Sequence, residues 1–508
     1  MRHRVAIGRT LPKYCEEAPF HPDRHYPEIG FADTSSEPNG AYALTRQLFY
    51  DLGLDRDRFG TTNWNPLGST VSPGQTVVIK PNFVLHRNES GGDPFAVITH
   101  PSVIRAVIDY TFLALAGQGR IVIADAPMMT CDWAKLMALT RIASIQQFYR
   151  ERFGFEIELY DLRPFALVDP NKPALSDNRQ PLPGDPLGCI TVDLGAESLL
   201  APLASDRFYG ADYDRAATIK QHHGNVHRYR ISQTVLSADV VISVPKMKTH
   251  KKVGVTLNAK GLVGINVDKN CLVHYRVGTP KNGGDQLPDS TDAADQTVIR
   301  VQRWCYDHLL AEANPVTNAL YRGLLGAYRL LVKPFRPVSR QTAALDSGNW
   351  YGNDSAWRMT ADLLRIILFA DRHGRMASIP RTPQRKLFCL VDGIIGGDCE
   401  GPLSPSACHA GLMTAGADPM SVDLVTTRAM GIDPQLVKQF SPAYNPESPL
   451  YRDEANITVC ESREEWPLSE SSWPSSTFNF QPHSGWVGHI EWVAEPLVAE
   501  PLQRTAAV

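Results

Sequence analysis

The feature that most constrains the fold is a strand–helix–strand succession early in the chain. Residues 76–79 form a short apolar run of strand length that ends at Lys80. Residues 97–117 then carry apolar side chains at helical spacing, and residues 121–127 form a second buried run with Asp125 near its end. A crossover of this kind joins parallel strands. We therefore predict an α/β fold with a mainly parallel sheet flanked by helices.

Two later apolar runs end in the same way. Residues 240–244 lead into a basic segment, and residues 386–391 end before a glycine-rich segment. In open parallel sheets, ligands sit beyond the carboxyl ends of the strands. We expect these strands to share one sheet and to present at one edge the side chains that follow them, namely Lys80, Asp125, Lys246 and Asp392.

The segment after residue 244 carries most of the candidate site. Four lysines and His250 occur within residues 246–252, and Lys260 follows among glycines. Cations beside backbone that can approach a ligand closely suit an anionic group. The alternative is a solvated basic loop, which most lysine runs form.

Candidate roles follow from side-chain chemistry. His250 titrates near neutral pH, so we predict a general acid or base there; a loop histidine bonded to backbone is the alternative. The predicted catalytic set is His250, Lys248 and Asp125. The predicted substrate-binding set is Lys80, Asn82, Lys246 and Lys260, in which the lysines hold the anion.

Carboxylates near the last strand suggest a metal. Asp392, Asp398 and Glu400 lie in or beside a glycine-rich loop, and carboxylates of this kind hold Mg²⁺ or Mn²⁺ beside an anionic substrate. We predict these three as metal ligands and a divalent metal as the candidate cofactor. A turn stabilised by aspartate caps is the alternative.

Six blocks of the chain form a recognisable series: VVIKPN (77–82), THPSVIRAVID (99–109), IADAP (123–127), VPKMKTH (244–250), LVDGIIGGDCEGPLS (390–404) and AGADPMSVDLVTTRAMGIDP (415–434). In this order they resemble DUF362, an uncharacterised bacterial and archaeal family. The resemblance implies no established chemistry. The run at 261–289 resembles a branch of the family that is associated with surface-polysaccharide genes.

The cysteines depart from the pattern of many DUF362 proteins. Those members carry a ferredoxin-like run of closely spaced cysteines, and a cluster needs four thiolates. Here none of the nine cysteines forms Cys-x-x-Cys, and the tightest pair is Cys399 and Cys408. We therefore do not expect an iron–sulfur cluster.

Composition limits the remaining classes of partner. A net charge of −3 argues against a general nucleic-acid binder, which needs a basic surface. No run reaches the roughly eighteen apolar residues of a membrane span. Sparse, unpatterned cysteines suit a reducing compartment. We expect a cytoplasmic protein.

The chain divides into one α/β unit and a tail. We predict the unit over residues 1–463, with insertions at about 128–236 and 290–350, and a tail over 464–508 whose end is disordered. Residues 320–333 have the spacing of an amphipathic helix. Packing against the core is the favoured interpretation, and contact with a membrane surface or a partner is the alternative.

Two functions remain open. The first is an enzyme that acts on a small or sugar-linked anionic substrate, with or without a metal. The alternative is a non-enzymatic binding or assembly factor in surface polysaccharide biosynthesis or export.

Overall fold

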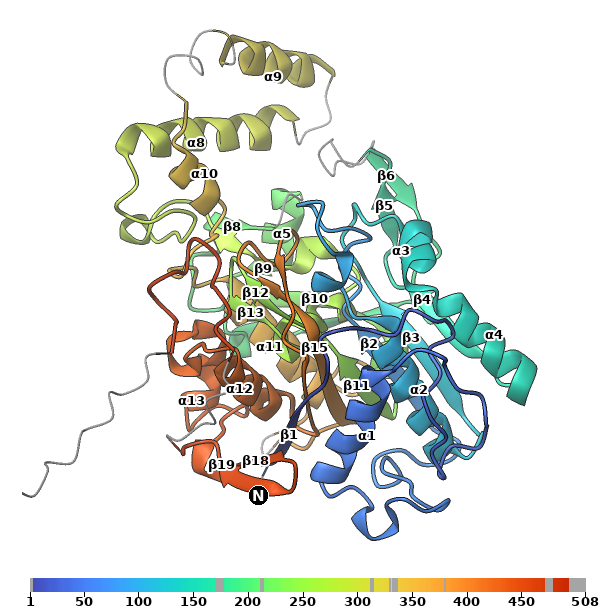
Figure 1. Ribbon diagram of the computed structural model, residues 1–508. Coiled ribbons are helices and arrows are strands. Elements are labelled where there is room, and N and C mark those ends of the chain that lie inside the picture. Colours follow the sequence, from blue (N-terminus) through green and yellow to red (C-terminus); the bar gives the residue numbers. More distant parts are fainter. Residues whose placement is uncertain are drawn as a thin grey trace, which may run out of the picture.

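A twelve-stranded mixed sheet forms the centre of the molecule in the computed structural model (Figure 1). The structure describes residues 3–169, 178–210, 214–310, 315–328, 330, 337–378, 381–470 and 478–492. The longest path through the sheet has the order β19-β18-β1-β17-β15-β11-β2-β3-β4.

One half of this path is parallel. Neighbouring strands run in the same direction from β15 (Lys386–Asp398) through β11 (Val240–Val244), β2 (Thr76–Pro81) and β3 (Arg120–Asp125) to β4 (Ile157–Asp161). The predicted fold class is confirmed, and the four predicted strands lie side by side in one sheet.

The other half closes the sheet with strands from both ends of the chain. The strand β1 (His3–Arg9) pairs antiparallel with β17 (Leu412–Gly416), which pairs antiparallel with β15. On its other side β1 pairs parallel with β18 (Ile457–Glu461), followed by the antiparallel β19 (Glu464–Pro467).

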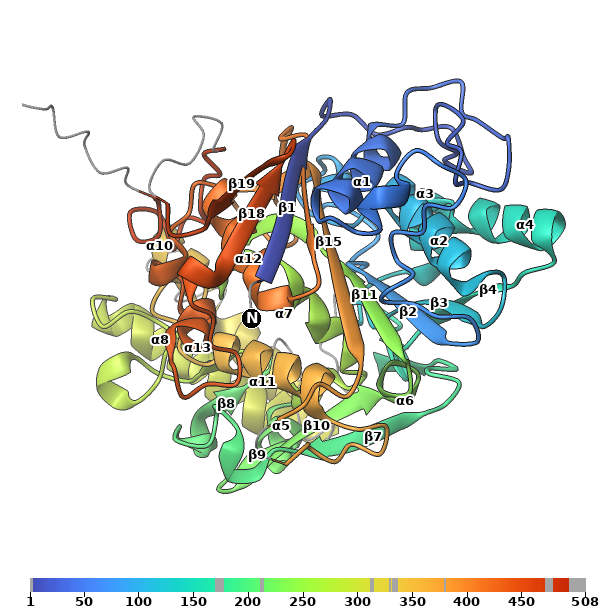
Figure 2. The ribbon, with the colours of Figure 1, turned by 90° about the horizontal axis from the view of Figure 1, so that it is seen from below.

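Helices cover both faces of the sheet, because side chains in each strand alternate between the faces. In β2, Val77 and Ile79 pack with α1 (Gly40–Asp51) and α2 (Pro101–Leu115). Val78 belongs to the opposite core, with α11 (Ala356–Phe369) and α12 (Pro419–Ala429). Figure 2 shows α1 and α2 on one side of the sheet and α11 on the other. The outer helices beside β4 are α3 (Trp133–Thr140) and α4 (Ile142–Phe153).

The basic segment is a strand and not a loop. The strand β12 (Lys246–His250) pairs with the distal part of β15 and with β13 (Gly254–Thr256). It forms because β15 continues for six residues beyond Asp392 and offers a second pairing edge. The chain then forms α7 (Asn258–Gly261) and two 3₁₀ helices, η6 (Leu262–Ile265) and η7 (Lys269–Cys271).

The predicted insertion at 128–236 is too long, because β4 within it belongs to the main sheet. The remainder forms small accessory sheets. They are β5 (Phe165–Leu167) with β6 (Arg179–Pro181); β7 (Cys189–Asp193) with β10 (Val226–Ser232) and β9 (His222–His223); and β8 (Phe208–Tyr209) with β14 (Tyr275–Arg276). Two short helices, α5 (Arg215–Gln221) and α6 (Gln233–Leu236), accompany them.

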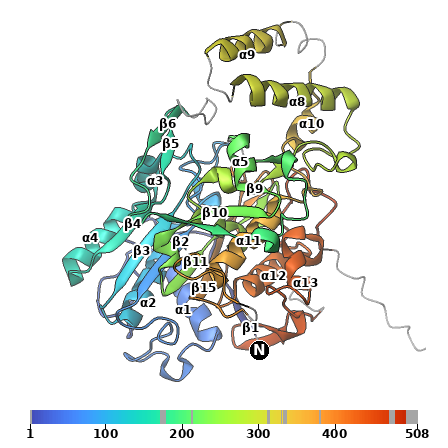
Figure 3. The ribbon, with the colours of Figure 1, turned by 180° about the vertical axis from the view of Figure 1, so that it is seen from behind.

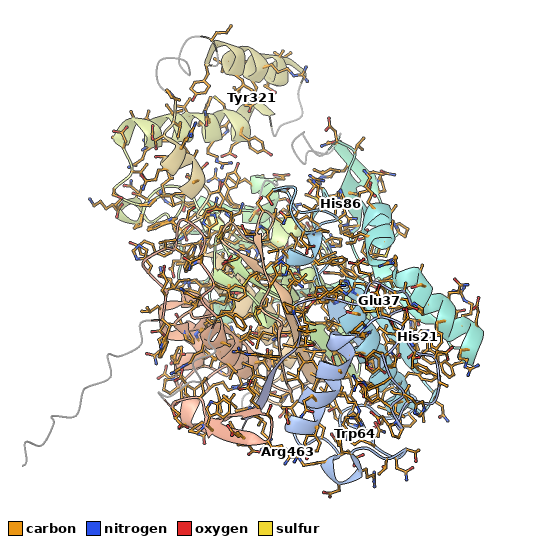
Figure 4. The ribbon with its side chains drawn as sticks, viewed as in Figure 1. His21, Glu37, Trp64, His86, Tyr321 and Arg463 are labelled. Carbon is orange, nitrogen blue, oxygen red and sulfur yellow. The ribbon has the colours of Figure 1, made fainter. Side chains whose placement is uncertain are left out.

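The second insertion is helical and projects from the body. It contains α8 (Ala293–Cys305), α9 (Pro315–Ala327) and α10 (Arg340–Leu345), and α9 lies at the end of the molecule farthest from the sheet (Figures 1 and 3). Figure 4 shows Tyr321 of α9 far from Trp64, which packs in the core near α1. Leu320 and Leu324 are 53% and 45% exposed. Core packing of this helix is therefore wrong for its described residues; 331–333 lie outside them.

The tail begins by covering the body. Trp486 is buried, and its indole nitrogen donates a hydrogen bond to the Lys251 carbonyl at 2.7 Å. The predicted disordered end, residues 494–508, lies outside the described residues. In the part of the chain that the structure describes, no helix is long and apolar enough to cross a membrane.

Candidate functional site

A cavity of about 250 Å³ lies where the predicted strand ends meet. Its wall includes Asn82 after β2, Asp125 at the end of β3, and the face of β12 that carries Lys248 and His250. The segments after β12 complete it with a group of further cations, Lys251, Lys252, Lys260 and Lys269. The order of the strands therefore brings the ends of separate strands together around one basic cavity.

Asp125 carries the one carboxylate among the described residues of the wall, and it is already paired. The Lys80 ammonium lies 2.8 Å from Asp125 Oδ1, and the Phe83 amide donates to Oδ2 at 2.7 Å. A Cβ atom at Gly264 would lie 1.9 Å from Asp125 Oδ1, so this close packing requires glycine. Asp125 and Lys80 thus neutralise each other, and among the described residues no carboxylate contacts the ammonium groups of Lys248, Lys260 and Lys269.

In the part of the chain that the structure describes, the ammonium groups of two wall lysines are hydrogen-bonded to backbone carbonyls alone. Lys248 Nζ donates to Val97 O at 2.7 Å and to Pro402 O at 3.2 Å. Lys269 Nζ donates to Ala126 O at 2.8 Å and to Asn266 O at 3.2 Å.

Burial makes the charged form of both lysines costly. It lowers the pKa of Lys248 well below its usual value, with the charge of Lys260 adding to the effect. It lowers the pKa of Lys269 to about 7. Lys248 is 1% exposed, so the alternative of a solvated loop is wrong for this side chain.

Lys260, on α7, is another cation of the cavity wall. Among the described residues, its ammonium has no hydrogen-bond or ion-pair partner, and burial lowers its pKa to about 8. Its helix, α7, is held in place by hydrogen bonds to Asp423 of α12. That carboxylate accepts the amides of Asn258 and Ala259 at 2.8 and 2.9 Å. The backbone at Lys260 is therefore fixed while its ammonium stays available to a ligand.

Two histidines line the cavity with opposite bonding. His250 Nδ1 accepts the Lys252 amide at 3.0 Å, whereas His274 Nδ1 lies 2.8 Å from the Leu272 carbonyl and must donate to it. Burial and the neighbouring lysines lower the pKa of both imidazoles well below the usual value. Both rings are therefore neutral at pH 7.

Lys246 and Asp392 lie outside the wall. Lys246 Nζ is 2.9 Å from Asp392 Oδ2 and donates to the Tyr14 hydroxyl at 2.7 Å; that hydroxyl donates to Asp392 Oδ1 at 2.5 Å. Both charged side chains are fully buried. The register of β12 against β15 shifts between Lys246 and Lys248, which separates this pair from the cavity side chains. The contacts favour a structural role for both.

The three predicted metal ligands have separate partners. Asp392 is held by Lys246, Asp398 accepts the Cys399 amide at 2.9 Å, and Glu400 lies 2.8 Å from His483. Among the described residues, no three His, Cys, Asp or Glu side chains form a group that could hold a metal ion.

Sequence reasoning missed His274 and gave Lys269 no role. Both follow α7 in irregular and 3₁₀ segments that have no strand or helix periodicity. Their proximity in sequence to Lys260 was the available signal.

Comparison with known proteins places the chain in a family. The model for "Domain of unknown function (DUF362)" matches residues 77–169 and 190–428. The chain belongs to the DUF362 family. Every predicted site residue of this DUF362 protein lies within the matched ranges.

Other comparisons add little. No curated protein matches the sequence. A crystal structure of a protein from Thermotoga maritima matches at 10% identity with a TM-score of 0.27. That match covers 74% of this chain and 56% of the other, so it spans little more than half of the Thermotoga protein.

Proposed function

We propose that this DUF362 protein is an enzyme that binds a small anionic substrate in the lysine cavity. The observation that carries the proposal is the charge of the wall. Lys248, Lys260 and Lys269 meet there without a carboxylate of their own.

Electrostatics explains why such a wall favours an anion. Lys248 and Lys269 are buried and Lys260 is half-buried; among the described residues none of the three contacts a carboxylate that would offset its desolvation, and the lysines also repel one another. A bound phosphate or carboxylate would supply the missing counter-charge. A hydrogen bond to a charged group contributes roughly 1.5–3 kcal/mol, so three such lysines together contribute about 4.5–9 kcal/mol, where micromolar binding corresponds to about 8 kcal/mol.

The volume argues for a small ligand. Drug-sized molecules occupy pockets of roughly 300–1,000 Å³, and this cavity of about 250 Å³ is smaller. It suits one anionic group with a short carbon skeleton or a single sugar unit, and not a polymer. A divalent metal bound with the substrate stays a prediction that elemental analysis of the purified protein would test.

The exposed helix α9 favours a second candidate function. Its apolar side chains Val316, Leu320 and Leu324 are 76%, 53% and 45% exposed. A factor that assembles with other components of surface polysaccharide biosynthesis would use such a face. A membrane surface would be contacted by the same side chains.

Ligand-dependent thermal stabilisation tests the proposal. Sugar phosphates and short carboxylates should raise the melting temperature of the full-length protein, and the matching neutral sugars should not. The Lys260→Met variant should lose this response, and Lys281→Met, at an exposed lysine outside the cavity wall, should keep it. Equal stabilisation of both variants, or no response to any anion, would overturn the proposed anion site.

A further inference from the structure

The bonding of the two cavity histidines fixes which nitrogen of each neutral ring carries the proton. The Lys252 amide occupies His250 Nδ1, so the proton of the neutral ring is on Nε2. The Leu272 carbonyl takes the proton of His274 Nδ1, so its Nε2 carries a lone pair. Among the described residues, neither Nε2 has a hydrogen-bond partner, and both rings line the cavity.

We propose that His274 is the proton acceptor of this cavity and that His250 is a neutral hydrogen-bond donor. The inference rests on the proposed function, since it concerns the chemistry done on the bound anion. It moves the acid–base role from His250, where the sequence suggested it, to a residue whose ring can gain a proton without losing a bond.

The pair suits one class of reaction, the proton-transfer isomerisation of a small anion that has a C–H bond next to a carbonyl group. His274 Nε2 removes the proton, and the C–H electron pair moves into a carbon–carbon double bond as the carbonyl oxygen becomes an oxyanion. The His250 Nε2–H bond stabilises that oxyanion, and His250 keeps its proton. In a substrate with a hydroxyl group on the carbon that loses the proton, the hydroxyl proton moves to the oxyanion and the hydroxyl oxygen becomes the new carbonyl oxygen. The electron pair of the carbon–carbon double bond then forms a C–H bond at the former carbonyl carbon with the proton that His274 returns. Atoms and electrons balance without an oxidant or co-reactant.

The charges of nearby lysines make the pKa of His274 depend on whether an anion is bound. Burial lowers the pKa of His274 most, and the charges of Lys260 on α7, Lys252 after β12 and Lys269 on η7 lower it further. The nearby Asp125 carboxylate is paired with Lys80. An anion bound among these lysines offsets their field, so the pKa of His274 should rise when the ligand is present. The pKa of His250 should rise less, because protonation of its Nδ1 would break the hydrogen bond from the Lys252 amide.

Nitrogen-15 NMR of the histidine rings tests the inference directly, because the shifts and proton couplings identify each tautomer. The full chain would be labelled and titrated between pH 5 and 8, with and without inorganic sulfate. The resonances would be identified by their loss in His250→Gln and His274→Gln. Sequential through-bond assignment of the wild type gives the same identification where a variant does not fold.

The expected result is an Nε2–H tautomer for His250 and an Nδ1–H tautomer for His274 in the absence of sulfate. Sulfate should raise the titration midpoint of His274 by a unit or more, and that of His250 by less. The same tautomer in both rings, the reverse assignment, or a larger shift at His250 would overturn the inference. Sulfate binding is read independently from thermal stabilisation, so failure of the anion site is distinguishable from failure of the base assignment.

Discussion

At the scale of single residues, two buried lysines of one strand have opposite roles. Lys246 is neutralised by Asp392, whereas Lys248 faces the cavity with only carbonyls around it. Both follow the same buried strand in the sequence, so strand-end reasoning places them together. The shift in register that separates them depends on how β15 continues, which no local pattern predicts.

The first prediction concerns Lys246. Lys246→Met should lower the free energy of unfolding by about 3–5 kcal/mol, because it leaves the Asp392 carboxylate buried without its cation. Denaturant unfolding measures this. Lys260→Met is the matched control, since it removes a lysine without a described partner and should leave the stability unchanged or higher. Equal losses in the two variants would contradict the assignment of Lys246 as structural.

At the scale of elements, the sequence predicted the strands and helices that have a regular hydrophobic period, and it missed the segments that have none. The strands ending at Lys80 and Asp125 and the helix between them follow from period and burial. The helix begins at Pro101 with His100 as its N-cap, and Thr99 Oγ1 donates to Val244 O instead of capping the helix. The 3₁₀ segments that carry Lys269 have no such periodicity.

The second prediction concerns the close packing of η6 against Lys80 of β2 and Asp125 of β3. Gly264→Ala should force apart the Lys80–Asp125 pair, because the added Cβ would lie 1.9 Å from Asp125 Oδ1 and 2.7 Å from Lys80 Nζ. We expect a loss of about 2–4 kcal/mol in unfolding free energy, together with weaker anion binding. Gly30→Ala is the control, since a Cβ there meets no atom within 4 Å. Wild-type stability in Gly264→Ala would contradict this account of η6.

At the scale of the whole molecule, parallel strands brought from distant parts of the sequence build one basic cavity. The sheet order was predictable because four apolar runs ended in polar residues. The exposed position of helix α9 was not predictable, because an amphipathic pattern does not show whether the apolar face of a helix packs against the core.

The third prediction is the pH dependence of stability without ligand. The pKa values of Lys260 and Lys269 are lowered in the folded state to about 8 and about 7. The folded state therefore binds these protons more weakly than the unfolded chain, so these lysines should make stability rise between pH 7 and pH 9. Lys260→Met should reduce the slope in denaturant unfolding at several pH values. An unchanged slope in this variant would mean that Lys260 is solvated.

The most direct test of the central claim is the affinity for inorganic sulfate, measured by calorimetry at pH 7 and pH 9. Sulfate keeps its charge over this range, so a change in affinity reports on the protein. If Lys260, with a pKa of about 8, must be charged to bind the anion, affinity should fall about tenfold from pH 7 to pH 9. Lys260→Met should bind weakly at both pH values, and Lys281→Met should behave as the wild type. Wild-type affinity in Lys260→Met, or an affinity independent of pH, would contradict the account.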